Sequence, residues 1–174
     1  MRIALAGLSH KTAAVELRER LEFRPDALAE AGAELRAAVG AEECAFLSTC
    51  NRVEVYAFAP YERVARGGLA DYLGRFHGAG ELPAEAVYEH FDGDAVRHLF
   101  RVAAGLDSLA LGETQVTAQV RQWYERARDL GLTGKVLNRL FQQSLHTAKH
   151  VWSETDLARG QTSIGSLAVK LAER

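Results

Sequence analysis

The sequence contains few cysteines and no pattern typical of metal ligands. Cys44 and Cys50 are the two cysteines among 174 residues. If the segment that carries Cys44 is a strand, the two Cα atoms lie ~20 Å apart, whereas a disulfide tolerates less than ~7 Å. There is no C-x-x-C pair and no histidine–cysteine cluster at zinc spacing. We therefore expect two free thiols and no structural metal.

The sequence also lacks long apolar runs and a large excess of one charge. No apolar run approaches the ~20 residues that a membrane span requires. Gly7 and His10 interrupt the N-terminal apolar segment too early for a signal peptide. These absences predict a cytoplasmic protein without membrane contact. The formal net charge of −2 gives no general attraction to nucleic acid, so a polynucleotide contact would require a local basic patch.

What the chain does contain is an alternation of strand and helix patterns. Four segments are rich in aliphatic, β-branched and aromatic residues and predict strands: RIALAGL, ECAFLS, VEVYAFA and AVYEHF. Helices are predicted between the first two strands, over residues 62–77 between the third and fourth, and after the fourth. The order β-α-β-β-α-β predicts an α+β fold with a ferredoxin-like domain, followed by further helix.

The region beyond about residue 107 is predicted to be almost entirely helical, with helices over roughly 113–130, 135–155 and 162 to the end. We therefore divide the chain into three parts: a ferredoxin-like core over 1–106, a helical part over 107–160, and the start of a linker helix over 161–174. The last segment carries no glycine or proline stop signal, which favours a piece cut from a longer protein.

The segment STCNRVEVY contains a thiol two residues before an arginine. In an extended chain, Cys50, Arg52 and Glu54 share one side. A guanidinium favours the thiolate form of a nearby thiol, and it can also hold a carboxylate through two parallel hydrogen bonds. Together with the polar groups of Thr49 and Asn51, this combination suits acyl transfer.

The alternative is that Cys50 is an ordinary buried residue, because free cysteine is among the most buried residue types. Cys44 is expected to be of that kind, since it lies inside an apolar strand. The pattern around His98 does not decide between the two possibilities. That histidine falls on the border of the polar face of its predicted helix, and by itself it indicates a surface position.

Four segments together resemble the glutamyl-tRNA reductase family: GLSHKTAAVELRERLEF, STCNRVEVY, AVRHLFRVAAGLDSLALGETQVTAQVR and TSIGSLAVKLA. The resemblance follows the whole chain in order. It implies the N-terminal catalytic domain of an enzyme that opens tetrapyrrole (porphyrin) biosynthesis. In that chemistry a cysteine thiol takes the glutamyl group from glutamyl-tRNA as a thioester, which NADPH reduces to glutamate-1-semialdehyde.

The resemblance also implies roles for individual residues. Cys50 would be the nucleophile, and His98 would be catalytic as a proton donor or acceptor. Substrate-binding roles are implied for eight residues: Thr49, Asn51, Arg52, Ser108, Glu113, Thr114, Gln115 and Gln119. Gln115 and Gln119 lie one turn apart on a predicted helix and share a face, although a solvated helix start would look the same. Thr114 stands where the family commonly has proline, which affects helix geometry rather than chemistry.

Arg52 would then recognise the side-chain carboxylate of glutamate. A glutamine side chain in the same place would leave the guanidinium poorly paired, and such mismatches discriminate strongly.

NADPH is the cofactor that the resemblance implies for the full-length enzyme. The implied partners are glutamyl-tRNA, a second copy in a homodimer, and glutamate-1-semialdehyde aminomutase. No G-x-G-x-x-G motif or close variant occurs in this sequence, and the nearest glycine pair, Gly78 and Gly80, leads into ELPAE. We therefore expect this chain alone to carry only the thioester or esterase half of the reaction. The alternative is a ferredoxin-like RNA-binding or regulatory module with an incidental thiol.

Polar and basic residues recur every three or four positions along the helix predicted over about 135–155. They are predicted to line one face: Lys135, Arg139, Gln142, His146 and Lys149. Phosphate contacts require such a local patch more than they require net charge. This face is therefore a candidate contact for the tRNA, although a solvated helix face is an equally good interpretation.

Overall fold

The computed structural model describes residues 1–65, 67–109 and 115–155. In this part of the chain, four strands form one antiparallel sheet in the order β2-β3-β1-β4. The strands are β1 (Arg2–Ser9), β2 (Glu43–Thr49), β3 (Arg52–Ala59) and β4 (Tyr88–Phe91). All four predicted strands are present, and the predicted mixed class of strands and helices is confirmed.

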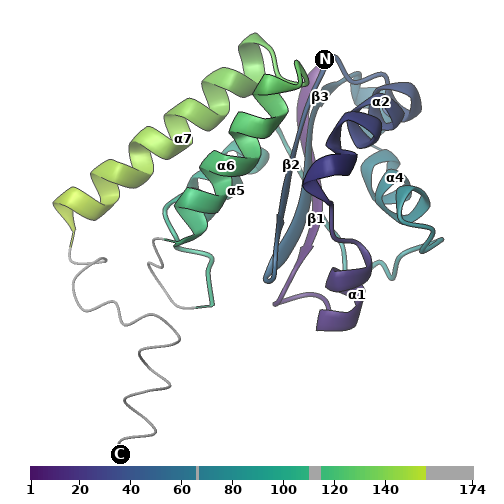
Figure 1. Cartoon of the computed structure of the whole chain (residues 1–174), viewed down its shortest axis with the longest axis horizontal. Coiled ribbons are helices and arrows are strands. Elements are labelled where there is room, and N and C mark those ends of the chain that lie inside the picture. Colours follow the sequence, from purple (N-terminus) through teal and green to yellow (C-terminus); the bar gives the residue numbers. More distant parts are fainter. Residues whose placement is uncertain (66, 110–114, 156–174) are drawn as a thin grey trace, which may run out of the picture.

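Helices cover both faces of this sheet. Between strands lie α1 (Val15–Arg20), η1 (Pro25–Ala27), α2 (Leu28–Val39), α3 (Tyr61–Val64) and α4 (Gly68–Phe76). After β4 come α5 (Asp92–Ala103), α6 (Gln115–Asp129) and α7 (Lys135–Glu154). Figure 1 shows α2 and α4 on one side of the sheet and α5, α6 and α7 on the other. The described part of the chain is therefore a three-layer structure of helix, sheet and helix.

Burial on both faces explains why the strands lack a clean alternation of apolar and polar residues. Nearly every residue of β2 and β3 is buried, because α2 covers one side and α6 and α7 cover the other. The apolar side chains of Leu5, Phe46 and Leu47 are completely removed from solvent. Each such burial contributes roughly 1.5–3 kcal/mol to folding, so the sheet is the centre of the core.

The single helix predicted over 62–77 is divided into α3 and α4. Gly67 separates them, with a φ of 77°. This left-handed conformation is incompatible with a continuous right-handed helix and costs little only for glycine. The prediction of one uninterrupted helix is therefore wrong at this point.

Helix α7 begins with a cap supplied by the sheet rather than by its own first residues. The carboxylate of Glu43, at the start of β2, accepts hydrogen bonds from the backbone N–H groups of Val136 (3.0 Å) and Leu137 (2.7 Å). A Cβ at Gly134 would lie 2.8 Å from Oε1 of Glu43, so glycine leaves room for this carboxylate. The contact fixes where α7 starts relative to the sheet.

Some predictions fall on residues outside the described ranges. They are the last predicted helix and the linker segment over 161–174. Within the described ranges, no helix combines the length and apolar character needed to cross a membrane.

Candidate active site

A tight turn between β2 and β3 carries the thiol of Cys50. Thr49 pairs with Arg52 across the two strands, so Cys50 and Asn51 form the two-residue connection, and Cys50 is exposed. The hydroxyl of Thr49 accepts hydrogen bonds from the backbone N–H groups of Asn51 and Arg52, both at 3.2 Å. The chain therefore reverses at Cys50. The prediction of an extended chain from Cys50 to Arg52 is therefore wrong, although both residues line the same cavity.

The turn is held in place by the segment that follows β1. The Nε–H of Arg18 donates to the carbonyl oxygen of Cys50 at 3.1 Å. The backbone N–H of His10 donates to the carbonyl oxygen of Asn51 at 2.8 Å. The backbone carbonyls are thus anchored while the thiol stays exposed, as a nucleophile for a large substrate would require.

A small cavity lies beside the thiol, with a volume of about 50 Å³. Its lining comes from the turn, the segment after α5 and the first turns of α6: Thr49, Cys50, Asn51, Arg52, Ser108, Gln115, Val116 and Gln119. The fold therefore brings together predicted site residues that lie up to seventy positions apart. Glu113 and Thr114 lie outside the described residues.

Arg52 lines this cavity but is not a free cation. Its side chain is 1% exposed, and Nη1 donates to Oε1 of Glu54 at 2.8 Å. Nη2 donates to the carbonyl oxygen of Asp107 at 2.7 Å and to its Oδ2 at 3.3 Å. Burial alone would lower the pKa of Arg52, but the charge of Glu54 outweighs it and raises the pKa. The expected open carboxylate clamp is thus already paired with two carboxylates.

Glu54 is the centre of a buried polar network that the sequence did not single out. Its side chain is 0% exposed and accepts hydrogen bonds from three donors: Arg52 (2.8 Å), Tyr56 (2.7 Å) and Tyr88 (2.6 Å). Nε2 of His98 lies 2.7 Å from Oε1. Burial alone would raise the pKa of Glu54, but the charge of Arg52 and the contact with His98 lower it. The carboxylate is therefore ionised and fully paired. Its position two residues after Arg52 on one strand was the available signal.

His98 points from α5 toward the sheet, and its side chain is 13% exposed. The surface position indicated by its helix pattern is therefore wrong. The imidazole packs against the rings of Tyr88 and His90, with centroids 5.2 Å and 5.1 Å away. It is not among the described residues that line the cavity beside Cys50. It is linked to that cavity through Glu54 and Arg52.

Asp107 closes the network on the solvent side. Besides its contacts with Arg52, its carboxylate forms an ion pair with Lys11. Burial alone would raise the pKa of Asp107, but the hydrogen bond from Lys11 and the charge of Arg52 lower it. Sequence reasoning missed both Asp107 and Lys11, because their pairing joins residues that lie far apart in the sequence.

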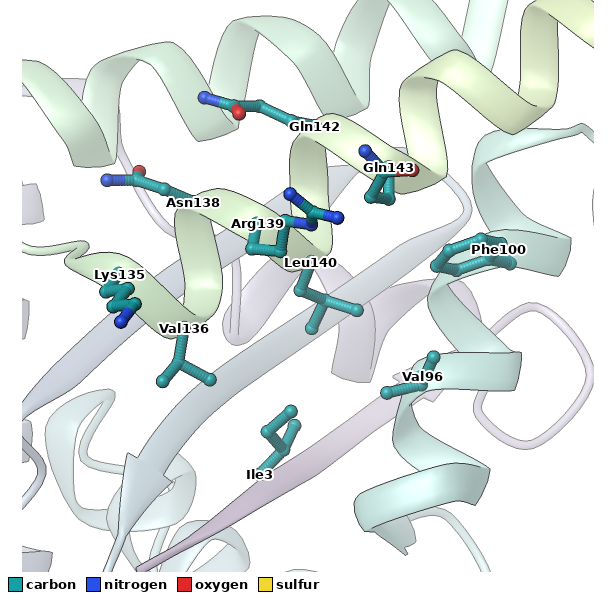
Figure 2. A pocket seen from close by; sticks show the side chains of 10 residues that line it. All are labelled: Ile3, Val96, Phe100, Lys135, Val136, Asn138, Arg139, Leu140, Gln142 and Gln143. Carbon is teal, nitrogen blue, oxygen red and sulfur yellow. The ribbon is translucent and has the colours of Figure 1, made fainter.

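The predicted basic face of α7 is exposed, and its residues border two separate hollows. Lys135 and Arg139 border an apolar hollow of about 880 Å³, floored by Ile3, Phe100 and other apolar side chains of β1, α5 and α7 (Figure 2). The other members of the face border a hollow of about 280 Å³ between α6 and α7, which also takes in basic residues of α6. Its lining includes Arg121, Arg128, Gln142, His146 and Lys149.

These features define a class of protein. It is an α+β domain that presents an exposed thiol from a hairpin turn, beside a small polar cavity and a buried network of arginine, glutamate, tyrosine and histidine. The family model for the N-terminal domain of glutamyl-tRNAGlu reductase matches residues 6–155. The chain belongs to this family.

Individual relatives agree with the family match. The chain is 45% identical to the glutamyl-tRNA reductase of Pelotomaculum thermopropionicum over 175 residues, covering 100% of the chain and 39% of the relative. It is 44% identical to that of Chromohalobacter salexigens, covering 99% of the chain and 40% of the relative. The solved structure of glutamyl-tRNA reductase from Methanopyrus kandleri matches 99% of the chain and 39% of its own length, with a TM-score of 0.80 and 34% identity. The chain thus spans about two fifths of the length of these relatives.

Proposed function

We propose that this chain performs the thiol chemistry of a glutamyl-tRNA reductase. The sulfur of Cys50 attacks the carbonyl carbon of the ester that joins glutamate to its tRNA. The bond to the ribose oxygen breaks, and that oxygen takes a proton as the tRNA leaves. The exposed thiol on an anchored turn, beside a cavity lined by polar side chains, is the observation that carries this proposal.

The polar lining of the cavity would hold the glutamyl group. The side chains proposed to contact it are Thr49, Asn51, Arg52, Ser108, Gln115 and Gln119, and the family resemblance adds Glu113 and Thr114. Because Asp107 already binds Nη2 of Arg52, a substrate carboxylate would have to displace the Asp107 side chain to form its own pair. Asp107 has the exposure that this requires, since its side chain is 17% exposed.

His98 is proposed as the proton donor or acceptor of the reaction. Its imidazole lies behind Arg52 and Glu54 rather than on the cavity wall. A proton transfer from this position fits an arrangement in which the substrate lies over the turn and reaches toward α5.

NADPH does not fit the residues of this chain that the structure describes. The cavity beside Cys50 measures about 50 Å³, room for about two water molecules at ~30 Å³ each, and the sequence has no glycine-rich dinucleotide turn. In the full-length enzyme NADPH would supply the hydride. Without it, water should cleave the thioester and release glutamate and the free thiol.

The wider setting is proposed from the family. The full-length enzyme would act in the cytoplasm, at the start of porphyrin biosynthesis. Its partners would be glutamyl-tRNA, a second copy of itself and glutamate-1-semialdehyde aminomutase. The strand order β2-β3-β1-β4 supports our interpretation of the sheet as ferredoxin-like. The tRNA is proposed to contact α7 through Lys135, Arg139, His146 and Lys149.

The proposal is tested by the intact mass of the protein after exposure to glutamyl-tRNA. The wild-type chain should gain one glutamyl group, and Cys50→Ser should fold but gain none. Cys44→Ala is the matched control, because Cys44 is 0% exposed and burial raises its pKa to about 11. It should keep the adduct and lose at most ~1–2 kcal/mol of stability.

Two outcomes would contradict the proposal. One is equal loss of the adduct in the two folded variants. The other is RNA binding by the wild type with no adduct at all, which would instead support an RNA-binding module with an incidental thiol. The basic hollow between α6 and α7 is the observation that favours that second function.

A further inference from the structure

We propose that Glu54 is a positioning residue that fixes the tautomer of His98, so that Nδ1 of the imidazole is the atom that exchanges protons. The statement about the reaction rests on the proposed function of His98. The statement about the tautomer rests on the geometry of the network alone.

Three polar groups converge on one oxygen of Glu54. Oε1 lies 2.7 Å from Nε2 of His98, 2.8 Å from Nη1 of Arg52 and 2.6 Å from the hydroxyl of Tyr88. Oε2 accepts a hydrogen bond from the hydroxyl of Tyr56 at 2.7 Å. An ionised carboxylate can only accept hydrogen bonds, so Nε2 of His98 must carry a proton.

The carboxylate stays ionised because a buried arginine shares its oxygen. Arg52 is always charged, and it is as fully buried as Glu54. Protonating Glu54 would leave that guanidinium underpaired in the interior, which is strongly unfavourable. Burial alone would raise the pKa of Glu54, but the charge of Arg52 lowers it below its usual range. Nε2 of His98 therefore faces a hydrogen-bond acceptor.

Nδ1, the other ring nitrogen of His98, is the atom that remains available to exchange protons in the reaction. In the neutral ring only one nitrogen carries a proton, and Glu54 holds it on Nε2. Nδ1 has no hydrogen-bond partner within the described ranges. The groups that face the ring or the carboxylate of Glu54 are Tyr88 and His90 on β4 and Arg52 and Tyr56 on β3, with Asp107 behind the arginine.

The backbone of β1 keeps Glu54 in this position. Gly7 lies directly opposite Glu54 in the sheet. A Cβ at Gly7 would come within 2.7 Å of both Cγ of Glu54 and the carbonyl oxygen of Val53. The glutamate side chain thus occupies space that any other residue at position 7 would take, and this contact limits its movement.

Nitrogen-15 NMR of the histidine-labelled chain at alkaline pH tests the tautomer directly, with His98→Gln used to assign the signals. Neutral His98 should carry its proton on Nε2 in the wild type. In Glu54→Gln, which replaces the anionic acceptor with a neutral amide, the ratio of the Nε2–H to the Nδ1–H form should fall by about tenfold or more. Tyr56→Phe removes a hydrogen bond to the other oxygen, Oε2, and should leave that ratio unchanged.

A wild-type ring protonated on Nδ1 would overturn the inference even if Glu54→Gln failed to fold. So would a folded Glu54→Gln variant with the wild-type ratio. The role in the reaction has its own readout, the rate of acyl adduct formation on Cys50. This rate should fall by roughly 10- to 100-fold in Glu54→Gln and change little in Glu42→Gln, the same substitution at an exposed position outside the network.

The two kinds of failure are distinguishable. If the tautomer shifts but the rate does not, proton exchange through Nδ1 is refuted while the positioning by Glu54 stands. If the wild type forms no adduct at all, the proposed function fails, and the NMR result still decides the tautomer.

Discussion

At the scale of single residues, burial sets the chemical character of side chains of the same type. Cys44 lies near the start of β2 with 0% exposure, and burial raises its pKa to about 11. Cys50 lies six residues later on an exposed turn. A thiol must be accessible to attack a large substrate, so of the two thiols only Cys50 is placed to act as we propose.

A histidine far from the site provides a test of how burial affects stability. His77 packs edge-on against Phe23 with ring centroids 4.7 Å apart, and its Nε2 is buried without a hydrogen-bond partner within the described ranges. Burial lowers its pKa from 6.5 to about 4. Between these values the unfolded chain binds a proton that the folded chain does not. The contribution of neutral His77 to the free energy of unfolding is therefore fully present above about pH 6.5, and it is lost as the pH falls toward 4.

We predict that His77→Gln weakens the dependence of unfolding on pH. The free energy of unfolding, measured by urea titration, should fall less between about pH 7 and pH 5 in the variant than in the wild type, because the group that binds the extra proton is gone. His146→Gln, the same substitution at an exposed histidine, is the matched control, and the free energy of unfolding should fall less in His77→Gln than in this control. Parallel curves for His77→Gln and the wild type would show that His77 does not contribute.

At the scale of secondary-structure elements, α7 depends on the sheet for its first turn. The carboxylate of Glu43 in β2 caps α7 by accepting hydrogen bonds from two of the backbone N–H groups that are left unpaired at any helix start. Negative charge at this end also interacts favourably with the helix dipole. The bond between Glu43 and α7 thus couples the helical layer to the strand that leads to Cys50.

We predict that Glu43→Ala lowers the free energy of unfolding by about 2 kcal/mol, because the substitution leaves one buried and one partly buried N–H group without an acceptor. Glu42→Ala is the matched control, since the neighbouring Glu42 is exposed, and it should change stability by less than ~0.5 kcal/mol. Urea unfolding at neutral pH measures both. Equal losses in the two variants would contradict the capping role.

At the scale of the whole molecule, charge is distributed unevenly between the layers. The net charge is −2, yet the hollow between α6 and α7 is bordered by Arg121, Arg128 and Lys149. Farther along α7, Lys135 and Arg139 border the apolar hollow (Figure 2). In our proposal the tRNA would contact the layer of α5, α6 and α7.

We predict that Lys135→Glu combined with Arg139→Glu weakens the binding of glutamyl-tRNA and flattens its salt dependence. Each lost phosphate contact should reduce the slope of log affinity against log salt by about 0.7–0.9. The reactivity of Cys50 toward a small alkylating reagent should not change, because neither residue lines its cavity.

The control for this double variant is Arg63→Glu combined with Arg75→Glu, the same change of charge on exposed residues of α3 and α4. That control should retain the wild-type salt slope. If instead the two double variants weaken binding equally, the effect is one of net charge alone. Unaltered affinity of the α7 variant at low salt would place the contact elsewhere.

The sequence by itself determined the strands, most of the helices, the two free thiols and the family. These features depend on local patterns: runs of β-forming residues, the apolar spacing of α7, and motifs such as STCNR that remain readable without coordinates. The start and end of α7 were predicted to within about one residue of Lys135–Glu154. The division between α3 and α4 was missed, because a glycine inside a helical pattern does not reveal the sign of its φ.

Only the tertiary structure decided what the charged residues do. Arg52 was expected to face a substrate, but the fold pairs it with Glu54 and Asp107, the latter 55 positions away. His98 was assigned to a helix surface, but α5 turns it toward Glu54, 44 positions away. Such pairings depend on which helix covers which face of the sheet. A sequence pattern shows that a residue is polar, whereas its partner, and therefore its charge and proton, is set by packing between distant elements.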